Sequence, residues 1–377
     1  MPDNRLQRLH DAGQSIWLDY IDRPMLHDGE LERRIRDDAL TGMTSNPTIF
    51  EKALAEGSAY DAQLAHAGGD RTPWQLFELI ATEDVRRACD LFAGVYDATR
   101  GGDGYVSIEV SPGAAHDVAE TVDEARRLWR EVGRPNVMIK VPGTPEGAVA
   151  TRALLAEGIN VNVTLLFSLD AYRAIIEAYL SALEERAASG RPIDHLAGVA
   201  SFFVSRVDTE ADKRIDARIA AASEGEKARL AALKGKTAVA NAKLAYALFQ
   251  EMFAGPRWQA LAAKGARVQR PLWASTSTKN PAYRDVMYVE QLIGPHTVNT
   301  MPPATIEAFR DHGEVRRTVD AGLDEARRDL AALEAEGISL RDITDKLLVD
   351  GLASFAKSFD TLLAGLERKT ASLATTR

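Results

Sequence analysis

Lys140 is the residue whose setting points most clearly to chemistry. It stands in the segment NVMIKVPGT, near the end of an apolar run that Pro142 and Gly143 terminate. Apolar surroundings disfavour an ammonium relative to a free amine, so the pKa of this lysine should fall from its ordinary value of about 10.4. A neutral amine attacks ketones and aldehydes to form a Schiff base, which withdraws electrons from a breaking carbon bond. The alternative is a lysine whose stem lies along the apolar run while its ammonium reaches solvent, and this segment alone favours neither.

Two acidic residues in comparable settings could move the protons that an imine requires. Asp19 lies near the end of the apolar run SIWLDYI, and Glu109 lies near the end of YVSIEV. Taken singly, each is better explained as a strand-end cap or an ion-pair partner. In an α/β barrel, however, the carboxyl ends of the strands meet at one mouth, where these residues would face Lys140. The joint pattern favours acid–base chemistry around the lysine.

Further polar residues occur where apolar runs end. In NVNVTLLF, Asn162 and Thr164 are two residues apart, so they share one face of a strand that can hold a polar ligand or water. In TSNPTIF, Asn46 precedes a proline that restrains the backbone and can fix an amide that recognises a hydroxyl. Locally, a plain turn residue explains Asn46 better.

Two later segments could bind an anion. SFFVSRV places Ser201 and Arg206 at the end of one apolar run and the start of the next helix. LWASTSTKN places five polar residues after another run, namely Ser275, Thr276, Ser277, Thr278 and Lys279. Hydroxyls, backbone amides and a fixed guanidinium form phosphate sites, which barrels often build near their last strands. Either segment alone is better explained as a solvated helix start.

The elements that must position these residues alternate between short runs rich in β-branched residues and longer amphipathic stretches, as in βαβ units. Eight short runs lie within about 15–301, at 15–21, 39–45, 105–110, 136–141, 159–167, 196–204, 270–276 and 296–301. The helical patterns between them include 115–131, where Val118, Val122, Ala125 and Trp129 recur at helical spacing. Eight strands with intervening helices predict the α/β class and a (β/α)8 TIM barrel rather than an open sheet.

Two regions exceed the minimum for a barrel and predict extra helices. After the sixth strand, residues about 206–265 are charged and Ala-rich, with a turn near 223–224. After the eighth strand, residues about 303–374 have the pattern of further helices, and GISLRD at 337–342 offers a turn and an N-cap. No Pro/Ser-rich linker separates these regions from the barrel, and the sequence contains no internal repeat. We therefore expect one elaborated domain over 1–377.

Composition and charge exclude several classes of protein. The 377 residues are 45% hydrophobic and 27% charged, which is typical of globular proteins and excludes disordered or collagen-like chains. The net charge of −9 argues against nucleic acid and anionic membranes as partners, because both require a basic surface.

Cysteine usage and the N-terminus favour a cytoplasmic protein. Cys89 is the one cysteine, which excludes an intramolecular disulfide and a cysteine metal site, and the seven histidines show no metal-ligand spacing. The N-terminus lacks the apolar segment of a signal peptide. The longest apolar stretch, 196–204, is shorter than the roughly 20 residues of a membrane span.

Seven segments of the chain together resemble the transaldolase family. In chain order they are TSNPTIF, VSIEVSP, MIKVPGTPEG, NVTLLFS, ASFFVSRVD, WASTSTKNPAY and VNTMPP. The resemblance extends from about Asp11 to about Pro303. It implies a class I aldolase barrel whose Schiff-base lysine lies on the fourth strand, and Lys140 lies on the fourth predicted strand.

The resemblance also implies roles for the candidate residues. Lys140 matches the imine-forming lysine, and Asp19 matches the acid–base group at carbon–carbon cleavage. Glu109 and Thr164 match the pair that positions the water used in imine formation. The remaining matches are to positions that contact the substrate or its phosphate, namely Asn46, Asn162, Ser201, Phe203 and Arg206.

One segment departs from the family's pattern. Many members end the seventh strand with Gly-Ala-Ser-Phe-Arg, whose arginine is a second phosphate ligand, whereas this chain has ASTSTKN. Ser275 and Lys279 are the candidate phosphate contacts in this segment. The lysine offers a point charge in place of the two parallel hydrogen bonds that an arginine can donate. The long region after Arg206 and the extended C-terminal helices indicate the longer subgroup, and the chain could be a monomer or a homodimer.

The resemblance implies transfer of a dihydroxyacetone unit from sedoheptulose 7-phosphate to glyceraldehyde 3-phosphate. The products are erythrose 4-phosphate and fructose 6-phosphate, in the non-oxidative pentose phosphate pathway, and the reaction uses sugar-phosphate substrates without cofactor or metal. Two alternatives stay open: a related class I aldolase that releases free dihydroxyacetone or uses another aldehyde, and a non-catalytic sugar-phosphate binder on the same barrel. If the protein were a non-catalytic binder, we would expect the catalytic residues to have been replaced, yet all four candidate catalytic residues are present.

Overall fold

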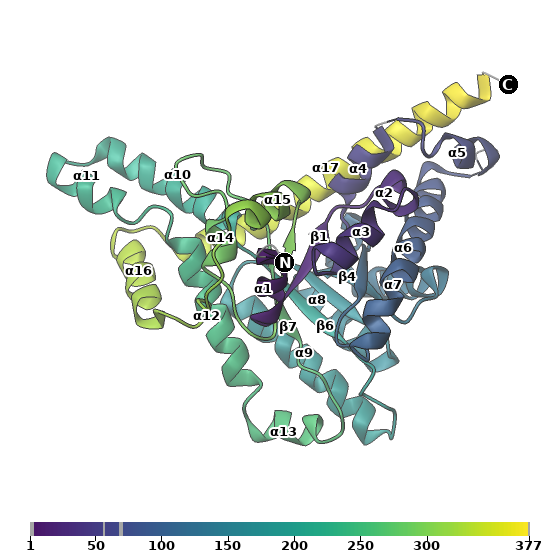
Figure 1. Cartoon of the computed structure of the whole chain (residues 1–377). Helices are drawn as coiled ribbons and strands as arrows, with labels where there is room; N and C mark the ends of the chain where they lie inside the picture. The colour runs from purple at the N-terminus through teal and green to yellow at the C-terminus, as the bar shows by residue number, and fades with distance from the viewer. Residues whose placement is uncertain (1–3, 56, 68–70, 376–377) are drawn as a thin grey trace.

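The computed structural model of the chain describes residues 4–55, 57–67 and 71–375. Within these residues, eight parallel strands close into a barrel in chain order, and β8 pairs with β1 (Figure 1). The strands are β1 Gln14–Asp19, β2 Leu40–Thr44, β3 Tyr105–Glu109, β4 Val137–Pro142, β5 Val161–Leu166, β6 Gly198–Phe203, β7 Arg270–Ala274 and β8 Thr297–Met301. The predicted TIM barrel is confirmed. Some predicted runs exceed the strands, because Ile21 and Leu196 pack in the core beyond the hydrogen-bonded ladder.

Helices surround this barrel and include the extra ones predicted after the sixth strand and at the C-terminus. They are α1 Arg5–Asp11, α2 Arg23–His27, α3 Glu30–Asp37, α4 Pro47–Ala55, α5 Asp61–Ala67, α6 Pro73–Ala98, the 3-10 helix Pro112–His116, α7 Val118–Val132, α8 Pro145–Glu157, α9 Leu169–Ala188, α10 Ser205–Ala221, α11 Glu224–Ala231, α12 Thr237–Met252, α13 Pro256–Ala262, α14 Met287–Glu290, α15 Pro303–His312, α16 Leu323–Ala335 and α17 Leu340–Thr375. Among the described residues, no helix combines the length and apolar character needed to cross a membrane.

Local capping explains where several helices begin. The predicted helix 115–131 starts too early, because the Asp117 side chain accepts a hydrogen bond from the backbone N–H of Glu120 and caps α7. The turn predicted near 223–224 is confirmed, since Ser223 and Glu226 form a reciprocal capping box at the start of α11. The N-cap predicted before the last helix is confirmed as well. Ser339 Oγ accepts the backbone N–H of Asp342 at 3.2 Å.

The last helix, yellow in Figure 1, passes α4 and α5 on its way to the C-terminus. Thr48 of α4 donates a hydrogen bond to Ser358 of α17 at 2.9 Å. Further along α17, Lys369 Nζ lies 2.8 Å from a carboxylate oxygen of Asp61 in α5. Since α4 begins three residues after β2 ends, these contacts hold α17 near the mouth of the barrel.

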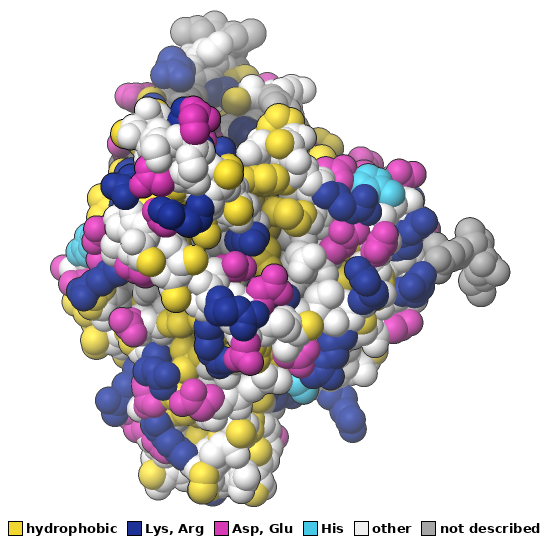
Figure 2. Space-filling view, turned by 90° about the vertical axis from the view of Figure 1, so that its left-hand side faces the viewer, with side chains coloured by type: hydrophobic (Ala, Val, Ile, Leu, Met, Phe, Trp, Pro, Cys, Tyr) yellow, Lys and Arg dark blue, Asp and Glu magenta, His cyan; other side chains and the backbone are white. Residues whose placement is uncertain are grey.

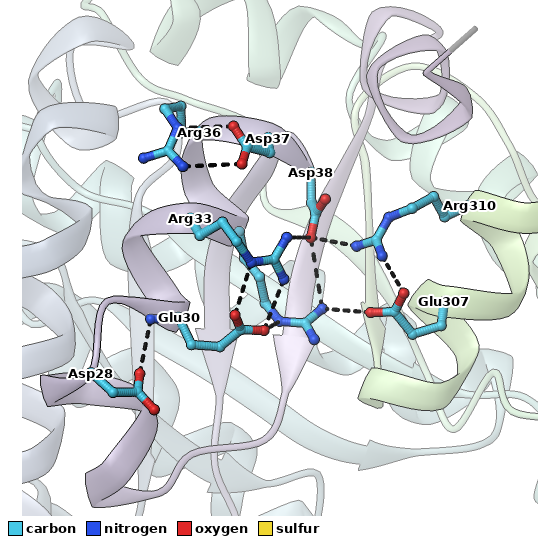
Figure 3. Close-up of polar contacts among 9 residues, drawn as sticks. Asp28, Glu30, Arg33, Arg36, Asp37, Asp38, Glu307 and Arg310 are labelled. Carbon is cyan, nitrogen blue, oxygen red and sulfur yellow. Dashed lines mark hydrogen bonds and ion pairs between the residues drawn. The ribbon is translucent and has the colours of Figure 1, made fainter. Parts of the chain in front are cut away.

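A cluster of ion pairs joins α3, before β2, to α15, after β8 (Figure 3). Arg34 of α3 lies 2.8 Å from Glu30 and 3.1 Å from Glu307 of α15. The buried carboxylate of Asp38 pairs with Arg310 of α15. This cluster therefore links the helix that precedes β2 to the helix that follows β8, the strand that closes the barrel by pairing with β1.

Inside the barrel, alternate residues of the strands meet on the axis. Asn162 donates from Nδ2 to Ser107 Oγ at 3.0 Å and accepts at Oδ1 from Ser201 Oγ at 2.7 Å. Toward the amino ends of the strands, the Trp17 indole occupies the space beside Gly42, where a Cβ would lie 2.5 Å from the indole nitrogen. This packed, hydrogen-bonded layer supports the residues at the carboxyl ends of the strands.

Candidate active site

The carboxyl ends of the strands enclose a cavity of about 410 Å³. Nine of the eleven predicted site residues line it, so segments far apart in the sequence meet there. They are Asp19, Asn46, Lys140, Thr164, Ser201, Phe203, Arg206, Ser275 and Lys279. The structure places the other two outside the cavity wall: Glu109 contacts Lys140, and Asn162 contacts Ser201.

Lys140 is held at the inner end of this cavity by two oxygen atoms. Its Nζ donates to Glu109 Oε2 at 3.1 Å and to the backbone oxygen of Ser45 at 3.1 Å. The strand register places Lys140 of β4 directly beside Glu109 of β3. Only 5% of Lys140 is exposed, and burial raises the pKa of Glu109 while the lysine acts in the opposite direction. This buried pair can therefore exchange a proton within one hydrogen bond.

Asp19 occupies the cavity wall on β1. Its Oδ1 accepts a hydrogen bond from Thr44 Oγ1 at 2.9 Å, and that hydroxyl lies 2.6 Å from Thr300 Oγ1. Because Thr44 donates its single proton to Asp19, Thr300 must donate to Thr44. Burial raises the pKa of Asp19, and Lys140 together with Thr44 opposes that rise. A carboxyl with a raised pKa can serve as both base and acid near neutral pH.

Two other polar groups face the cavity with bonding capacity to spare. The buried Thr164 Oγ1 has no hydrogen-bond partner among the described residues, which suits a bound water or substrate hydroxyl. Asn46 Oδ1 accepts the backbone N–H of Ile49 at 3.0 Å and so caps α4. Its amide nitrogen has no hydrogen-bond partner among the described residues, so Asn46 can both cap the helix and bind a ligand through its amide.

Arg206 brings a positive charge to the cavity wall. It is the second residue of α10, and its guanidinium lies over the Phe203 ring, 5.2 Å from the centroid. No described residue forms a hydrogen bond or ion pair with it, and burial lowers its pKa from the ordinary arginine value. A half-buried guanidinium without an ion-pair partner among the described residues is suited to an anionic ligand.

The segment after β7 brings a second cation to the cavity. Lys279 Nζ donates to Ser277 Oγ at 2.7 Å, and both residues line the cavity. Ser275 has a positive φ of 57°, an uncommon backbone conformation that clusters at functional sites, and its hydroxyl lies 3.0 Å from Ser205 Oγ.

Thr44, Thr300, Lys52 and Phe355 are among the cavity-lining residues that sequence reasoning missed. The sequence could have indicated Thr44, since it lies two residues after Gly42 and therefore on the same face of β2. The sequence could not have indicated Phe355, because this residue reaches the site from α17, where its ring centroid lies 5.9 Å from Lys140 Nζ. Within the described residues, no group of three or more His, Cys, Asp or Glu side chains is placed to hold a metal ion.

Comparison with known proteins adds independent evidence. The family model described as transaldolase/fructose-6-phosphate aldolase matches residues 16–366. A protein named transaldolase from Thermobifida fusca (strain YX) is 50% identical over 360 residues, covering 95% of this chain and 96% of that protein. A protein named transaldolase 2 from Nostoc sp. (strain PCC 7120) is 47% identical over 374 residues, with 98% of each chain covered. The similarity thus extends over nearly the whole chain.

Proposed function

The chain belongs to the transaldolase/fructose-6-phosphate aldolase family and is an enzyme of the transaldolase type, and we propose that Lys140 is its Schiff-base residue. The observation that carries this proposal is the position of Lys140 Nζ, buried at the end of the cavity and 3.1 Å from Glu109. The reaction transfers a dihydroxyacetone unit from a ketose phosphate, such as sedoheptulose 7-phosphate, to glyceraldehyde 3-phosphate.

The first half of the reaction forms and uses the imine. Glu109 takes a proton from the Lys140 ammonium, and the free amine attacks the ketose carbonyl at C2. Glu109 returns this proton to the carbinolamine hydroxyl, which leaves as water held by the Thr164 hydroxyl, and the protonated imine remains. Asp19 then takes the proton of the C4 hydroxyl as the C3–C4 bond breaks, and the aldose phosphate leaves.

The second half reverses these steps with another aldehyde. The enamine left on Lys140 attacks the aldehyde carbon of the acceptor, and Asp19 returns its proton to the new C4 hydroxyl. Hydrolysis of the new imine, with Glu109 and Thr164 again handling the water, releases the ketose phosphate product. Asn46 and Ser201 lie on the cavity wall where substrate hydroxyls pass, and Asn162 orients Ser201 through the 2.7 Å hydrogen bond between them.

The experiment that tests this function supplies fructose 6-phosphate with and without erythrose 4-phosphate. We expect sedoheptulose 7-phosphate, and glyceraldehyde 3-phosphate beyond one equivalent per active site, to form only when the acceptor is present. The family description also includes fructose-6-phosphate aldolase, which favours the class I aldolase as the second candidate. Acceptor-independent release of free dihydroxyacetone at a comparable rate would favour that candidate, and absence of any turnover would favour the non-catalytic binder.

Arg206, Ser275 and Lys279 form the proposed phosphate site, and a neutral amide at Arg206 or Lys279 should weaken substrate binding. We expect Arg206→Gln and Lys279→Gln each to raise KM for fructose 6-phosphate about 10- to 100-fold, the range for one lost hydrogen-bonded charge. Steady-state kinetics measures this. Arg214→Gln is the matched control, because Arg214 lies on the same helix but pairs with Glu210 at 2.9 Å. Equal KM changes in Arg206→Gln and Arg214→Gln would contradict the assignment.

Thr44→Val should impair cleavage while sparing imine formation. Thr44 donates the one hydrogen bond that Asp19 receives from the described residues, and this bond lowers the pKa of Asp19. Its loss raises that pKa further, so the ascending limb of the pH–rate profile should move to higher pH and kcat should fall about 10-fold. Thr41→Val is the control, since Thr41 Oγ1 bonds instead to the backbone of Ile16. An unchanged pH profile in Thr44→Val would exclude this role.

We also propose that residues 1–377 form one elaborated barrel domain. In support, a single hydrophobic cluster joins barrel residues such as Ile139 to Phe355 and Leu366 of α17. We place the enzyme in the cytoplasm as a monomer or homodimer, without nucleic-acid or membrane partners. The net charge of −9 supports the absence of nucleic-acid and membrane partners, as do the basic and acidic side chains interspersed on the face in Figure 2.

A further inference from the structure

The segment between β7 and α14 has to hold a charged side chain in place. Lys279 is exposed at the end of a flexible stem, in a segment with no helix or strand of its own. Ordering such a side chain costs up to about 2 kcal/mol, so a lysine that binds phosphate well needs a backbone fixed in advance. Hydrogen bonds within the segment fix part of this backbone, since Thr278 Oγ1 donates to the backbone oxygens of Arg284 and Asp285 at 3.0 and 3.1 Å.

Two tyrosine–aspartate hydrogen bonds tie this segment and the start of α14 to α10. Tyr283 donates its hydroxyl to Asp212 Oδ2 at 2.5 Å, and Tyr288 donates to Asp208 Oδ2 at 2.9 Å. Both aspartates follow Arg206 on α10, the helix that supplies the other cation of the proposed phosphate site. One helix therefore holds one cation and anchors the segment that carries the other.

The two carboxylates are themselves fixed from the opposite side. Asp212 Oδ1 accepts the backbone N–H of Gly235 at 3.0 Å, and Asp208 Oδ1 accepts that of Ala238 at 2.7 Å, at the start of α12. The Tyr283 ring also packs on Gly235, where a Cβ would lie 2.8 Å from the ring. Each aspartate is thus a rigid acceptor rather than a mobile surface group.

Lys279 stands between these carboxylates and the catalytic cavity. A second cavity of about 370 Å³, lined by Asp208, Asp212, Tyr283 and Tyr288, shares Lys279 with the catalytic one. Free carboxylates there would attract the ammonium away from the phosphate site. Burial raises the pKa of both tyrosines and the facing carboxylates raise it further, so the hydroxyls stay protonated and keep donating to those oxygens.

We propose that Tyr283 and Tyr288, bonded to Asp212 and Asp208, are positioning residues for the phosphate group of the substrate. They fix the segment that carries Lys279 against the helix that carries Arg206, and they occupy the carboxylate oxygens that would compete for the lysine. This inference rests on the phosphate-binding role proposed for Lys279.

Tyr283→Phe tests the inference, because it removes one hydroxyl and keeps the ring. We expect KM for fructose 6-phosphate and the inhibition constant of inorganic phosphate to rise about fivefold, with kcat within twofold of the wild type. The concentration of dihydroxyacetone that half-saturates borohydride trapping should not change, because dihydroxyacetone carries no phosphate. Equal shifts for dihydroxyacetone and for the phosphorylated ligands would overturn the proposal. If Tyr283→Phe does not fold, Tyr288→Phe carries the same test.

Three further variants separate the possible failures. Tyr246→Phe is the matched control, because its hydroxyl bonds to the backbone of Pro295 at 3.0 Å, away from Lys279, and KM should not change. If Lys279→Ala leaves KM unchanged, the proposed phosphate site itself is wrong. If Lys279→Ala raises KM but Tyr283→Phe does not, only the positioning role is wrong. In the Lys279→Ala background, Tyr283→Phe should add less than twofold, and a full fivefold increase there would show that the tyrosine does not act through the lysine.

Discussion

Lys140→Met is expected to lower the rate of dihydroxyacetone transfer by about 10⁴-fold or more, because no imine forms without the amine. Methionine keeps the length and apolar stem of the side chain. The replacement leaves Glu109 buried without its cation, but burial already raises the pKa of that carboxyl, so Glu109 should take up a proton rather than unfold the barrel. We therefore expect the variant to fold.

Coupled assays with fructose 6-phosphate and erythrose 4-phosphate measure this loss, and circular dichroism checks the fold. Lys243→Met is the control, because Lys243 bonds to the backbone of Ala321 at 2.8 Å, outside the catalytic cavity. Retention of more than about 1% of the rate by Lys140→Met would contradict a mechanism that requires this amine.

Asp19→Asn and Glu109→Gln should fail at different steps. Asp19→Asn keeps the acceptor for Thr44 but not the base for the C4 hydroxyl, so it should form an imine with the ketose without splitting it. The reduced adduct should then keep the full mass of the donor. Glu109→Gln leaves no carboxylate beside Lys140 to take its proton, so the appearance of any adduct should be slow. Each defect should lower the overall rate about 10²- to 10⁴-fold.

Thermal unfolding distinguishes these roles from structural ones. The folded state raises the pKa of Asp19, which means that its ionised form opposes folding at neutral pH. A neutral amide removes that cost, so Asp19→Asn should unfold at the same or a higher temperature than the wild type. If the two carboxyls merely hold strand ends, both amides should instead lower the unfolding temperature and leave the adduct masses unchanged.

The features that sequence alone can predict are local. Each short run of β-branched residues is long enough to identify its strand, and a parallel barrel of any such strands brings Asp19 and Lys140 to one mouth. The alternation of apolar and polar residues does not show that Asn162 is buried beneath Ser201, because that depends on how far each strand extends into the barrel. The start of α7 could have been predicted from the sequence, since aspartate is a common N-cap residue and Asp117 caps this helix.

The remaining parts depend on tertiary packing between distant segments. Phe355 meets Lys140 only because α17 crosses back over α4, and the Thr44–Thr300 pair exists only because β8 closes the barrel beside β1. The two tyrosine–aspartate bonds likewise join residues more than 70 positions apart. No sequence pattern in a single chain reports such contacts.

Reductive trapping shows directly which lysine forms the imine. The wild-type enzyme is treated with borohydride in the presence of fructose 6-phosphate, digested, and mapped by mass spectrometry. We expect one substrate-derived adduct, on the peptide that contains Lys140, carrying the mass of a reduced dihydroxyacetone unit or of the whole ketose phosphate. An adduct on any other lysine, or no adduct on an enzyme that is fully active in transfer, would contradict this expectation.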